Sequence, residues 1–519
     1  MTSAKFREEF DKYDPIDVEG VVIEHKKWIA ERMRRHRSTM WINLASLCLS
    51  LLLIISTFIP LRNLLSTMYP ENGLGYFSLC CIYASYVIGC YALSAIAHYI
   101  HPKGAIVLAI IGHSIFAGSH LYPSFETLIP ASCILGLCQA VLWRSQELLC
   151  TSYAANFAAL SGINVSDVLK RFHMALILSV QLAQIMGNSL VSFIFFQHHT
   201  LNKAHFTERI NSTLTFSSDE AAMIGSSNRA VRDISYIPSE PLSVQHFHSP
   251  FAHDHPFAAM NVDYCPKEPL SIVNTYAGEF HTVKIVFLSF TIAALVMVSV
   301  FLHKPDILVQ KRNLEFKHQL HEIFHVWVEK RWLLTTGVVF YSGIQQALIV
   351  GELTKITSIC SLGVPYLGFL MVTFGLGSFF ADTISSRIQK VGGRILTGIA
   401  GFMVSGGLLS LTLLWRPDEA GSTLVFAFIG GWGIVDGIWQ SQITALVKTQ
   451  FIEYGEAVKV NAHVLQALGS AIAFGYAPFV SFSTKAYVSL AFVAWAIMGY
   501  IVWESTTVTF QMRSMSSSV

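Results

Sequence analysis

The sequence of 519 residues is poor in charged side chains. Asp, Glu, Lys and Arg make up only 13% of it, whereas hydrophobic residues make up 53% and the mean hydropathy is +0.50. Ordinary globular proteins contain about 25% charged residues, so a water-soluble chain of this length could not hide so much apolar surface. The net charge is only +2, and the basic residues fall between apolar runs. Nucleic acid is therefore not expected as a partner.

The sequence also lacks the motifs on which a catalytic or metal site would rest. It contains no CxxC, no HExxH, no Walker loop and no GxSxG, and its nine cysteines are scattered, most of them inside apolar runs. This pattern predicts a protein that is not an enzyme and that has no catalytic, cofactor or metal site.

One histidine-rich stretch, QHFHSPFAHDHPF, is dense enough in imidazoles to consider a metal. It contains His246, His248, His253 and His255, but it has two prolines and no cysteine, so specific zinc binding is not favoured. A flexible loop that gains protons in acidic compartments is the alternative. A disulfide between Cys265 and Cys360 is conceivable, although nothing in the sequence fixes their separation.

Long apolar runs dominate what is present. A helix needs about 20 apolar residues to cross the hydrocarbon core, and the first such run begins at Trp41 behind a polar segment, so it is a retained helix rather than a signal peptide. We predict an all-α membrane protein with twelve transmembrane helices in two six-helix pseudo-repeats, a major-facilitator-like fold. The predicted spans are 41–60, 77–98, 104–122, 127–148, 173–196, 282–302, 332–351, 363–381, 394–415, 421–443, 458–480 and 484–503.

The distribution of Lys and Arg predicts that both termini are cytoplasmic. The tail 1–40 carries nine basic residues and the linker 303–331 is also basic. The short loops on the outside carry one basic residue each, namely Arg62, Lys355, Arg416 and Lys485. The chain then divides into a first half at 41–302, the linker, a second half at 332–503 and a cytoplasmic tail at 504–519. The bilayer involved is the plasma membrane or an endomembrane.

The largest outside segment, 197–281, is rich in Ser, His and Pro and shows no hydrophobic periodicity, so irregular structure is expected there. It contains a glycosylation sequon at Asn211. A second sequon at Asn164 lies on the cytoplasmic side and should carry no glycan.

The two halves share a short internal sequence repeat, here called the echo. The fourth and tenth spans end in LWRSQ (Trp143, Gln146) and IWQSQ (Trp439, Gln442), and the fifth and eleventh contain QIMG and QALG. Such a duplication around a basic linker is the parallel-repeat architecture of major-facilitator proteins. The echo glutamines Gln146, Gln442, Gln184 and Gln466 could coordinate a solute or cation in a cavity, or could join helices by hydrogen bonds. The tryptophans fit interface anchoring.

Two charged residues of the same region should face the pseudo-twofold axis. Aligning the echo places Arg144 and Asp436 about one helical turn apart in depth, which predicts an ion pair between the halves. The alternative is that Arg144 reaches the cytoplasmic interface or pairs with Glu147. Asp436 is the one strong midplane carboxylate among the predicted spans, and this scarcity disfavours an ion-coupled carrier.

A charged loop between the second and third helices normally latches the halves of this fold. In the first half that loop reads AHYIHPKGA and lacks the required Asp and Arg. The corresponding loop of the second half keeps Asp382, Arg387, Lys390 and Arg394 as latch candidates. These basic residues could equally be positive-inside anchors.

Several long stretches resemble the uncoordinated-93-like (Unc-93) family. They are PLRNLLSTMYPENGLGYFSLCCIYAS at 60–85, GLCQAVLWRSQELLCTSYA at 136–154, RFHMALILSVQLAQIMGN ending at Asn188, CSLGVPYLGFLMVTFG at 360–375, DGIWQSQITALVKTQF at 436–451 and the run from Gln466 to Tyr476. Arg144 departs from the small residue usual in the family. The tails and the 197–281 segment match no pattern.

The resemblance implies a non-enzymatic accessory protein that binds and regulates or traffics another integral membrane protein. A two-pore-domain potassium channel subunit is favoured as partner, and escort of a receptor is the second form of this role. The rival hypothesis is a secondary transporter of a small solute or cation by alternating access. Gly398, Gly401, Ser405 and Gly406 on the ninth helix could form a docking face or serve internal packing. A sorting signal at Tyr13 and a PDZ ligand ending at Val519 are weaker short patterns.

Overall fold

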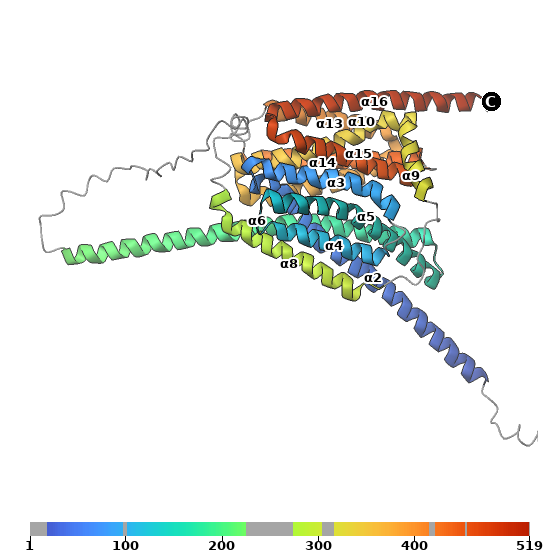
Figure 1. Cartoon of the computed structure of the whole chain (residues 1–519), viewed down its shortest axis with the longest axis horizontal. Coiled ribbons are helices and arrows are strands. Elements are labelled where there is room, and N and C mark those ends of the chain that lie inside the picture. Colours follow the sequence, from blue (N-terminus) through green and yellow to red (C-terminus); the bar gives the residue numbers. More distant parts are fainter. Residues whose placement is uncertain are drawn as a thin grey trace, which may run out of the picture.

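The computed structural model is a bundle of long helices (Figure 1). It describes residues 18–96, 101–224, 273–303, 316–414, 421–451 and 454–517, and every regular element in those ranges is helical. In chain order these are α2 (Val18–Met68), η1 (Glu71–Gly73), α3 (Leu74–Ile96), α4 (Pro102–Ser119), α5 (Phe125–Ser161), α6 (Val165–Ile224), α8 (Ala277–Phe301), α9 (Phe316–His325), η2 (Val326–Val328), α10 (Lys330–Leu348), η3 (Ile349–Leu353), α11 (Thr354–Ile356), η4 (Thr357–Leu362), η5 (Val364–Tyr366), α12 (Leu367–Gly392), α13 (Arg394–Leu414), α14 (Ser422–Gln450), α15 (Gly455–Tyr476), η7 (Ala477–Phe479) and α16 (Phe482–Ser517).

Eleven helices in the described ranges are long and apolar enough to cross a membrane. The all-α, multi-pass prediction is therefore confirmed. The predicted eleventh span corresponds to α15, which has 22 residues but is not among the eleven. It carries Glu456, Lys459, Asn461 and His463 near its start, which lowers its hydropathy. Passage of α15 through the bilayer stays a prediction, supported by its packing against both α10 and α3.

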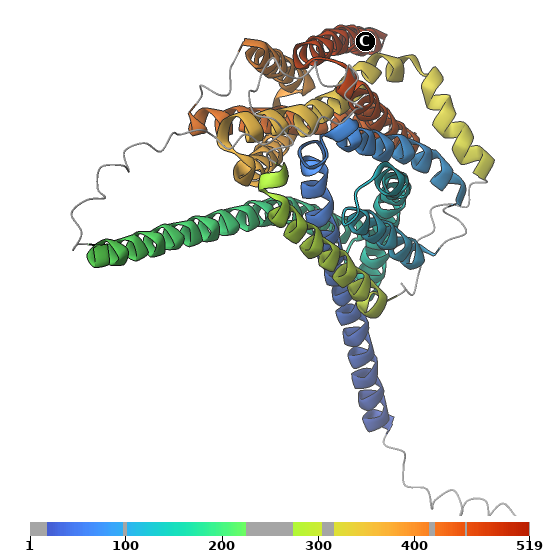
Figure 2. The ribbon, with the colours of Figure 1, turned by 60° about the vertical axis from the view of Figure 1, so that its left-hand side comes forward.

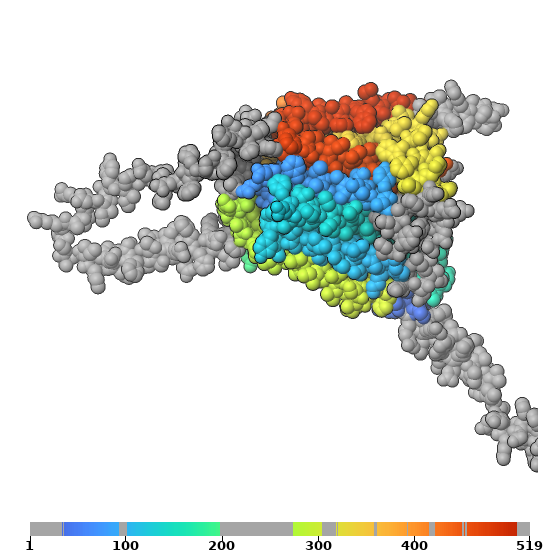
Figure 3. Space-filling view, in the orientation of Figure 1, coloured from blue at the N-terminus to red at the C-terminus, as the bar shows by residue number. Residues whose placement is uncertain are grey.

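The packing pairs repeat along the chain. In the first half α2 packs on α6 and α8, and α5 packs on α3 and α4; in the second half α10 packs on α15 and α16, and α14 packs on α12 and α13. The halves meet through α3 against α15 and α6 against α12. Figure 3 shows blue α3 bordering the red C-terminal helices. By position in the repeat, α3 corresponds to α12 and α6 corresponds to α15. The α3–α15 contact is therefore equivalent to the α12–α6 contact, as the predicted duplication requires.

The helix bundle has two ends, the linker end and the turn end. The linker end is where α8 ends and α9 and α10 begin, and the turn end is the opposite end, where α2 meets α3. In Figure 1 the linker end lies to the right and the turn end to the left. The sequence predicts that the linker end faces the cytoplasm.

The helices extend further than the span template predicted. Arg62, Lys355 and Lys485 lie inside α2, α11 and α16, so their assignment to outside loops was wrong, while Arg416 lies outside the described residues. The expectation of irregular structure from residue 197 was also wrong up to Ile224, because α6 continues to that residue (Figure 2). A window of about 20 residues measures hydrocarbon thickness, and it does not limit the length of a helix that extends beyond it.

Close helix approach at the turn end depends on glycine. A Cβ on Gly368 of α12 would overlap the carbonyl oxygen of Asn188 on α6. Ser192 of α6 adds a hydrogen bond at the same place, because its Oγ accepts from the backbone N–H of Phe369 at 3.0 Å. The α6–α12 junction therefore joins the halves by backbone contact, as small residues permit in membrane bundles.

Candidate functional site

A cavity of about 760 Å³ lies between the two halves. Its walls come from α2, α3, α5 and α6 on one side and from α9, α10, α14 and α15 on the other. It extends from Arg62 and Gln346 on the turn-end side to Arg144 and Glu456 at the linker end. A cavity between repeats is the place where proteins of this architecture hold small molecules.

At the turn end the cavity is backed by a buried polar junction. Lys485 of α16 pairs with Glu352 of η3 at 2.5 Å, and their side chains are only 3% and 7% exposed. Tyr76 of α3 reaches across from the first half and donates its hydroxyl to the carbonyl oxygen of Gly351 at 3.1 Å. The ammonium groups of Lys485 and Lys355 lie 5.5 and 5.8 Å from the centroid of the Tyr76 ring. This junction fixes α3 against the second half.

The backbone is unusual at that junction. Glu352 lies in η3, which is π-helical, and the following η4 is π-helical too, ending at Gly363 with φ of 97°. A π-helical turn shifts the register of the side chains on a helix and occurs frequently at functional sites. Here it directs the carbonyl of Gly351 and the carboxylate of Glu352 toward α3 and α16 respectively.

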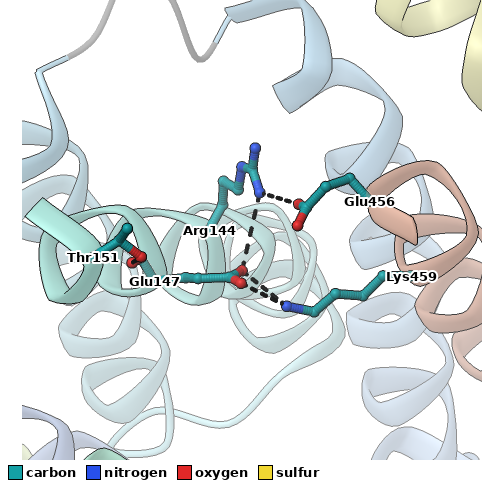
Figure 4. Close-up of polar contacts among 5 residues, drawn as sticks. All are labelled: Arg144, Glu147, Thr151, Glu456 and Lys459. Atoms are coloured by element: carbon teal, nitrogen blue, oxygen red, sulfur yellow. Dashed lines mark hydrogen bonds and ion pairs between the residues drawn. The ribbon is translucent and has the colours of Figure 1, made fainter. Parts of the chain in front are cut away.

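At the linker end a four-residue charge network joins α5 to α15 (Figure 4). Arg144 Nη1 lies 2.9 Å from Glu456 Oε2 and 3.9 Å from Glu147 Oε2. Lys459 Nζ donates to both carboxylate oxygens of Glu147 at 2.9 Å. The side chains of Arg144 and Glu456 are 43% and 48% exposed. Such pairs are weak and screened by salt, so this contact between halves can open at little cost.

The linker contributes a cover at the same end. Helix α9 packs on both α3 and α15. Asn461 of α15 donates to the carbonyl oxygen of Ile323 at 2.7 Å and accepts from Trp327 Nε1 at 3.0 Å. Tyr91 of α3 stacks on Phe324, with ring centroids 5.6 Å apart. The part of the linker that the structure describes thus bridges the two halves.

Asp436 is held inside its own half. Gln346 of α10 donates to Asp436 Oδ1 at 3.2 Å and Ser378 of α12 donates to Oδ2 at 2.8 Å. The carboxylate is buried and does not line the cavity, although Gln346 does. The predicted ion pair between Arg144 and Asp436 is therefore wrong. Arg144 instead pairs mainly with Glu456 and more distantly with Glu147, the second of which was the predicted alternative.

The echo residues diverge between the halves. Gln146 and Gln466 line the cavity, as does Trp143. Gln442 donates instead to the carbonyl oxygen of Arg394 at 2.9 Å and to Thr397. The side-chain amide of Gln184 lies against Gly375, where a Cβ would overlap it. Equivalent places in the repeat therefore serve different purposes.

Trp439 is a core residue. It is fully buried, donates its indole N–H to Ser405 Oγ at 3.1 Å and packs edge-on against Phe402. Interface anchoring was thus the wrong interpretation for this tryptophan. On the same helix as Ser405, α13, Gly401 faces Ile438 and Trp439, and Gly398 faces Tyr500, so these positions serve internal packing. Gly406 alone of the proposed docking residues meets open space.

The latch candidates lie where α12 ends and α13 begins. Asp382, Arg387 and Lys390 are in the last part of α12, and Arg394 opens α13 with its guanidinium 4.7 Å from the centroid of the Trp503 ring. Asp382 lies where α12 and α14 approach closely, since a Cβ on Gly437 would meet its backbone nitrogen at 2.8 Å. A latch role for these residues stays a prediction.

Some predictions fall outside the described residues. These are the histidines 246–255, Cys265, Tyr13 and Val519, and the side chains of Asn211 and Cys360. Within the described ranges no group of three or more His, Cys, Asp or Glu side chains is arranged to hold a metal ion.

The sequence reasoning missed the residues that pair at both ends. Glu352 follows the end of a predicted span by one residue, so it was treated as loop. Glu456 and Lys459 precede and open the predicted eleventh span. Charged residues that flank the predicted spans were a usable signal, because they can reach each other where helix ends meet.

Most of the chain matches one known protein family. Residues 70–503 match the sequence model of the family described as "Ion channel regulatory protein UNC-93". The chain belongs to the UNC-93 family. It is 25% identical over 455 residues to "Protein unc-93 homolog A" of Homo sapiens, covering 86% of this chain and 90% of that protein. It is 22% identical over 484 residues to the "Putative potassium channel regulatory protein unc-93" of Caenorhabditis elegans, covering 92% of this chain and 62% of that protein.

Two solved structures of similar shape are both of one transporter. The crystal structure of the nucleoside transporter NupG has a TM-score of 0.56 at 11% identity, covering 90% of the UNC-93 family chain and 98% of that structure. A mutant of the same transporter gives a TM-score of 0.58 at 10% identity, covering 90% of this chain and 99% of that structure. At these identities the similarity concerns the fold alone, and it confirms the predicted major-facilitator-like architecture.

Proposed function

We propose that this protein is a non-enzymatic accessory protein that binds another integral membrane protein and regulates its activity or delivery. The observation that carries the proposal is the family match over residues 70–503, which spans both halves and both ends of the cavity. The name of the Caenorhabditis elegans relative favours a potassium channel as the partner. A two-pore-domain channel subunit is the first partner to test, and receptor escort is the second form of the same role.

We propose that the partner protein contacts the exposed side of α13. Gly406 and Gly407 have no neighbouring atoms within 4 Å of a built Cβ, and Met403 beside them is exposed. Small residues allow a partner helix to approach closely in lipid. Internal packing does not account for these two glycines, in contrast to Gly398 and Gly401.

The test is co-expression of the tagged full chain with a two-pore-domain potassium channel subunit. We expect recovery of the channel after mild cross-linking, together with a change in its current. Gly406→Leu should lower recovery, while Met498→Leu on the exposed face of α16 serves as the matched control. Equal recovery with both variants would move the contact away from α13. No recovery of the channel or of a receptor from native membranes would contradict the accessory role.

A second function, secondary transport of a small solute or cation, is favoured by one observation. The cavity lies between the halves, with a buried junction at one end and a half-exposed charge network at the other. Alternating access needs contacts of this kind on both sides of a central site. Purified protein in liposomes with no partner present should be tested for solute flux down an ion gradient. Carrier-like flux that Asp436→Asn abolishes would replace the accessory proposal.

We also propose that the linker end faces the cytoplasm. The orientation rests on the nine basic residues before Trp41 and on the basic linker. Asn211 should then carry a glycan, and Asn164 should carry none. Replacing each with Gln and comparing mobility tests this: a shift for Asn164→Gln and none for Asn211→Gln would reverse the orientation.

A further inference from the structure

The cavity wall contains an arginine that sequence reasoning had placed in a loop. Arg62 lies in α2, within a helix long and apolar enough to span the membrane. It lines the cavity on the turn-end side. Ionisable residues inside membrane spans are rare and usually face a functional site or a paired charge. The groups around Arg62 therefore decide what it does.

Arg62 makes few direct contacts with other side chains. Its Nη1 donates to Tyr83 Oη at 3.2 Å, and its Cζ lies 5.8 Å from the centroid of the Phe58 ring. Its Nε is buried without a hydrogen-bond partner. No carboxylate of the described residues lies within ion-pair distance of it. A guanidinium offers five donors in a planar fork, and the Nη donors that Tyr83 leaves unused are available to a ligand.

The other Lys and Arg side chains that line the cavity are already paired. Of the lining cations, Arg144 bonds to Glu456 and Lys459 bonds to Glu147. The remaining lining carboxylate, Glu322, lies at the linker end on α9 and contacts His318 at 3.4 Å. The turn-end part of the cavity thus presents one cation and no lining carboxylate among the described residues.

Asp436 is the acidic residue to consider as a counter-ion, since its charge interacts with that of Arg62. Both of its oxygens are occupied by neutral donors, Gln346 and Ser378. It is buried behind Gln346 and does not line the cavity. The negative charge of Asp436 partly offsets the positive charge of Arg62, but its carboxylate forms no ion pair with the guanidinium group. A small ligand can therefore still bind there.

We propose that the cavity binds an organic monoanion with an aromatic or apolar body, and that Arg62 binds its carboxylate or sulfonate group. The guanidinium fork matches the two oxygens of such a group. Gln346 and Gln466 supply neutral polar contacts. The walls around the body of the ligand carry four aromatic side chains, Phe58, Tyr83, Tyr86 and Trp143.

The size of the cavity agrees with such a ligand. A volume of about 760 Å³ suits a molecule of drug-like size. The inference does not depend on the accessory role, because a ligand site of this kind can serve a regulator or a transporter.

The test uses the full chain in detergent and a matched pair of probes. Naproxen, an aryl carboxylate, and its neutral primary amide have nearly the same shape, so micelle partition and apolar contact are similar for both. Binding is measured with tritiated naproxen and with the amide as competitor. We expect naproxen to bind at least about tenfold more tightly than the amide, equivalent to about 1.4 kcal/mol. Arg62→Gln should remove this preference, whereas Arg62→Lys should retain part of it.

Arg171→Gln is the matched control, since it removes an exposed arginine of α6 that does not line the cavity. It should leave the preference for the acid unchanged. If Arg62→Gln does not fold, Arg62→Lys provides the test. Loss of the planar guanidinium group must weaken binding of naproxen and leave binding of the amide unaffected. The proposal is overturned by equal binding of acid and amide, by a preference that survives in Arg62→Gln, or by no naproxen binding up to about 1 mM.

Discussion

The two ends of the bundle join the halves by different means. At the turn end the hydroxyl of Tyr76 and direct backbone approach hold α3 and α6 against the second half, beside a buried Lys485–Glu352 pair that lies within the second half. At the linker end the contact between α5 and α15 consists of half-exposed charges. Buried pairs are costly to break because a lone charge stays in a low-dielectric site, whereas exposed pairs contribute little. The difference indicates a molecule fixed at one end and able to open at the other.

The largest effect is expected for Lys485→Ala. The change leaves the carboxylate of Glu352 buried without its partner, and breaking a buried pair costs about 3–5 kcal/mol. The melting temperature of the purified protein should fall sharply. Lys390→Ala, which removes an exposed lysine of α12, is the control and should change little.

The double variant Lys485→Met with Glu352→Gln sharpens the same comparison. Removing both charges avoids the lone buried carboxylate, so most of the lost stability should return. If Lys485→Ala had the same melting temperature as the wild type, this pair would not stabilise the turn end.

A smaller loss is expected for Gly368→Ala. The new Cβ would overlap the backbone oxygen of Asn188, so α12 and α6 must move apart. Overpacking of this kind costs about 1–3 kcal/mol. Gly406→Ala, where the same Cβ meets open space, should be neutral or stabilising because alanine favours helix. Equal melting temperatures for the two variants would argue against close contact at the α6–α12 junction.

Tyr76→Phe should have a still smaller effect at the turn end. It removes the hydroxyl that donates to the Gly351 carbonyl but keeps the ring beneath Lys485. One hydrogen bond contributes about 1 kcal/mol. The melting temperature should fall slightly and by the same amount at low and high salt, because neither atom of the hydrogen bond carries a net charge. A fall that salt abolishes would point to a role in the Lys485–Glu352 charge pair instead.

The fold class could be predicted from the sequence because long apolar runs indicate membrane-spanning helices directly. It was less informative for α15, whose first turns carry the charges that bind α5. It also misplaced Arg62 and Glu352, since a window set to the thickness of the bilayer ends before the helices do. The internal echo found equivalent positions in the two halves but could not show that Trp143 lines a cavity while Trp439 is buried in the core.

The candidate site was predictable only in part for a related reason. Helical periodicity gives the face on which Arg144 and Asp436 lie, but it does not say which neighbouring helix that face meets. Asp436 is satisfied by Gln346 and Ser378 from its own half, and Arg144 is satisfied by Glu456 from the other. Such partners come from helices distant in sequence, so only a three-dimensional arrangement identifies them.

The smallest effect is expected at the linker end, and its salt dependence is the informative quantity. Arg144→Gln and Glu456→Gln, alone and together, form a double-mutant cycle for a pair with N–O distance 2.9 Å. Because both side chains are nearly half exposed, their coupling should be about 0.2–1 kcal/mol at low salt and should shrink at high salt, where charges are screened within a few ångströms. Melting temperatures of the four proteins at two salt concentrations provide the measurement. Lys170→Gln, which removes an exposed lysine beside Asp167 within one helix, shows what a surface pair unrelated to the halves contributes. A coupling as large as that of the Lys485–Glu352 pair, and equal at both salt concentrations, would mean that the linker end is fixed as firmly as the turn end.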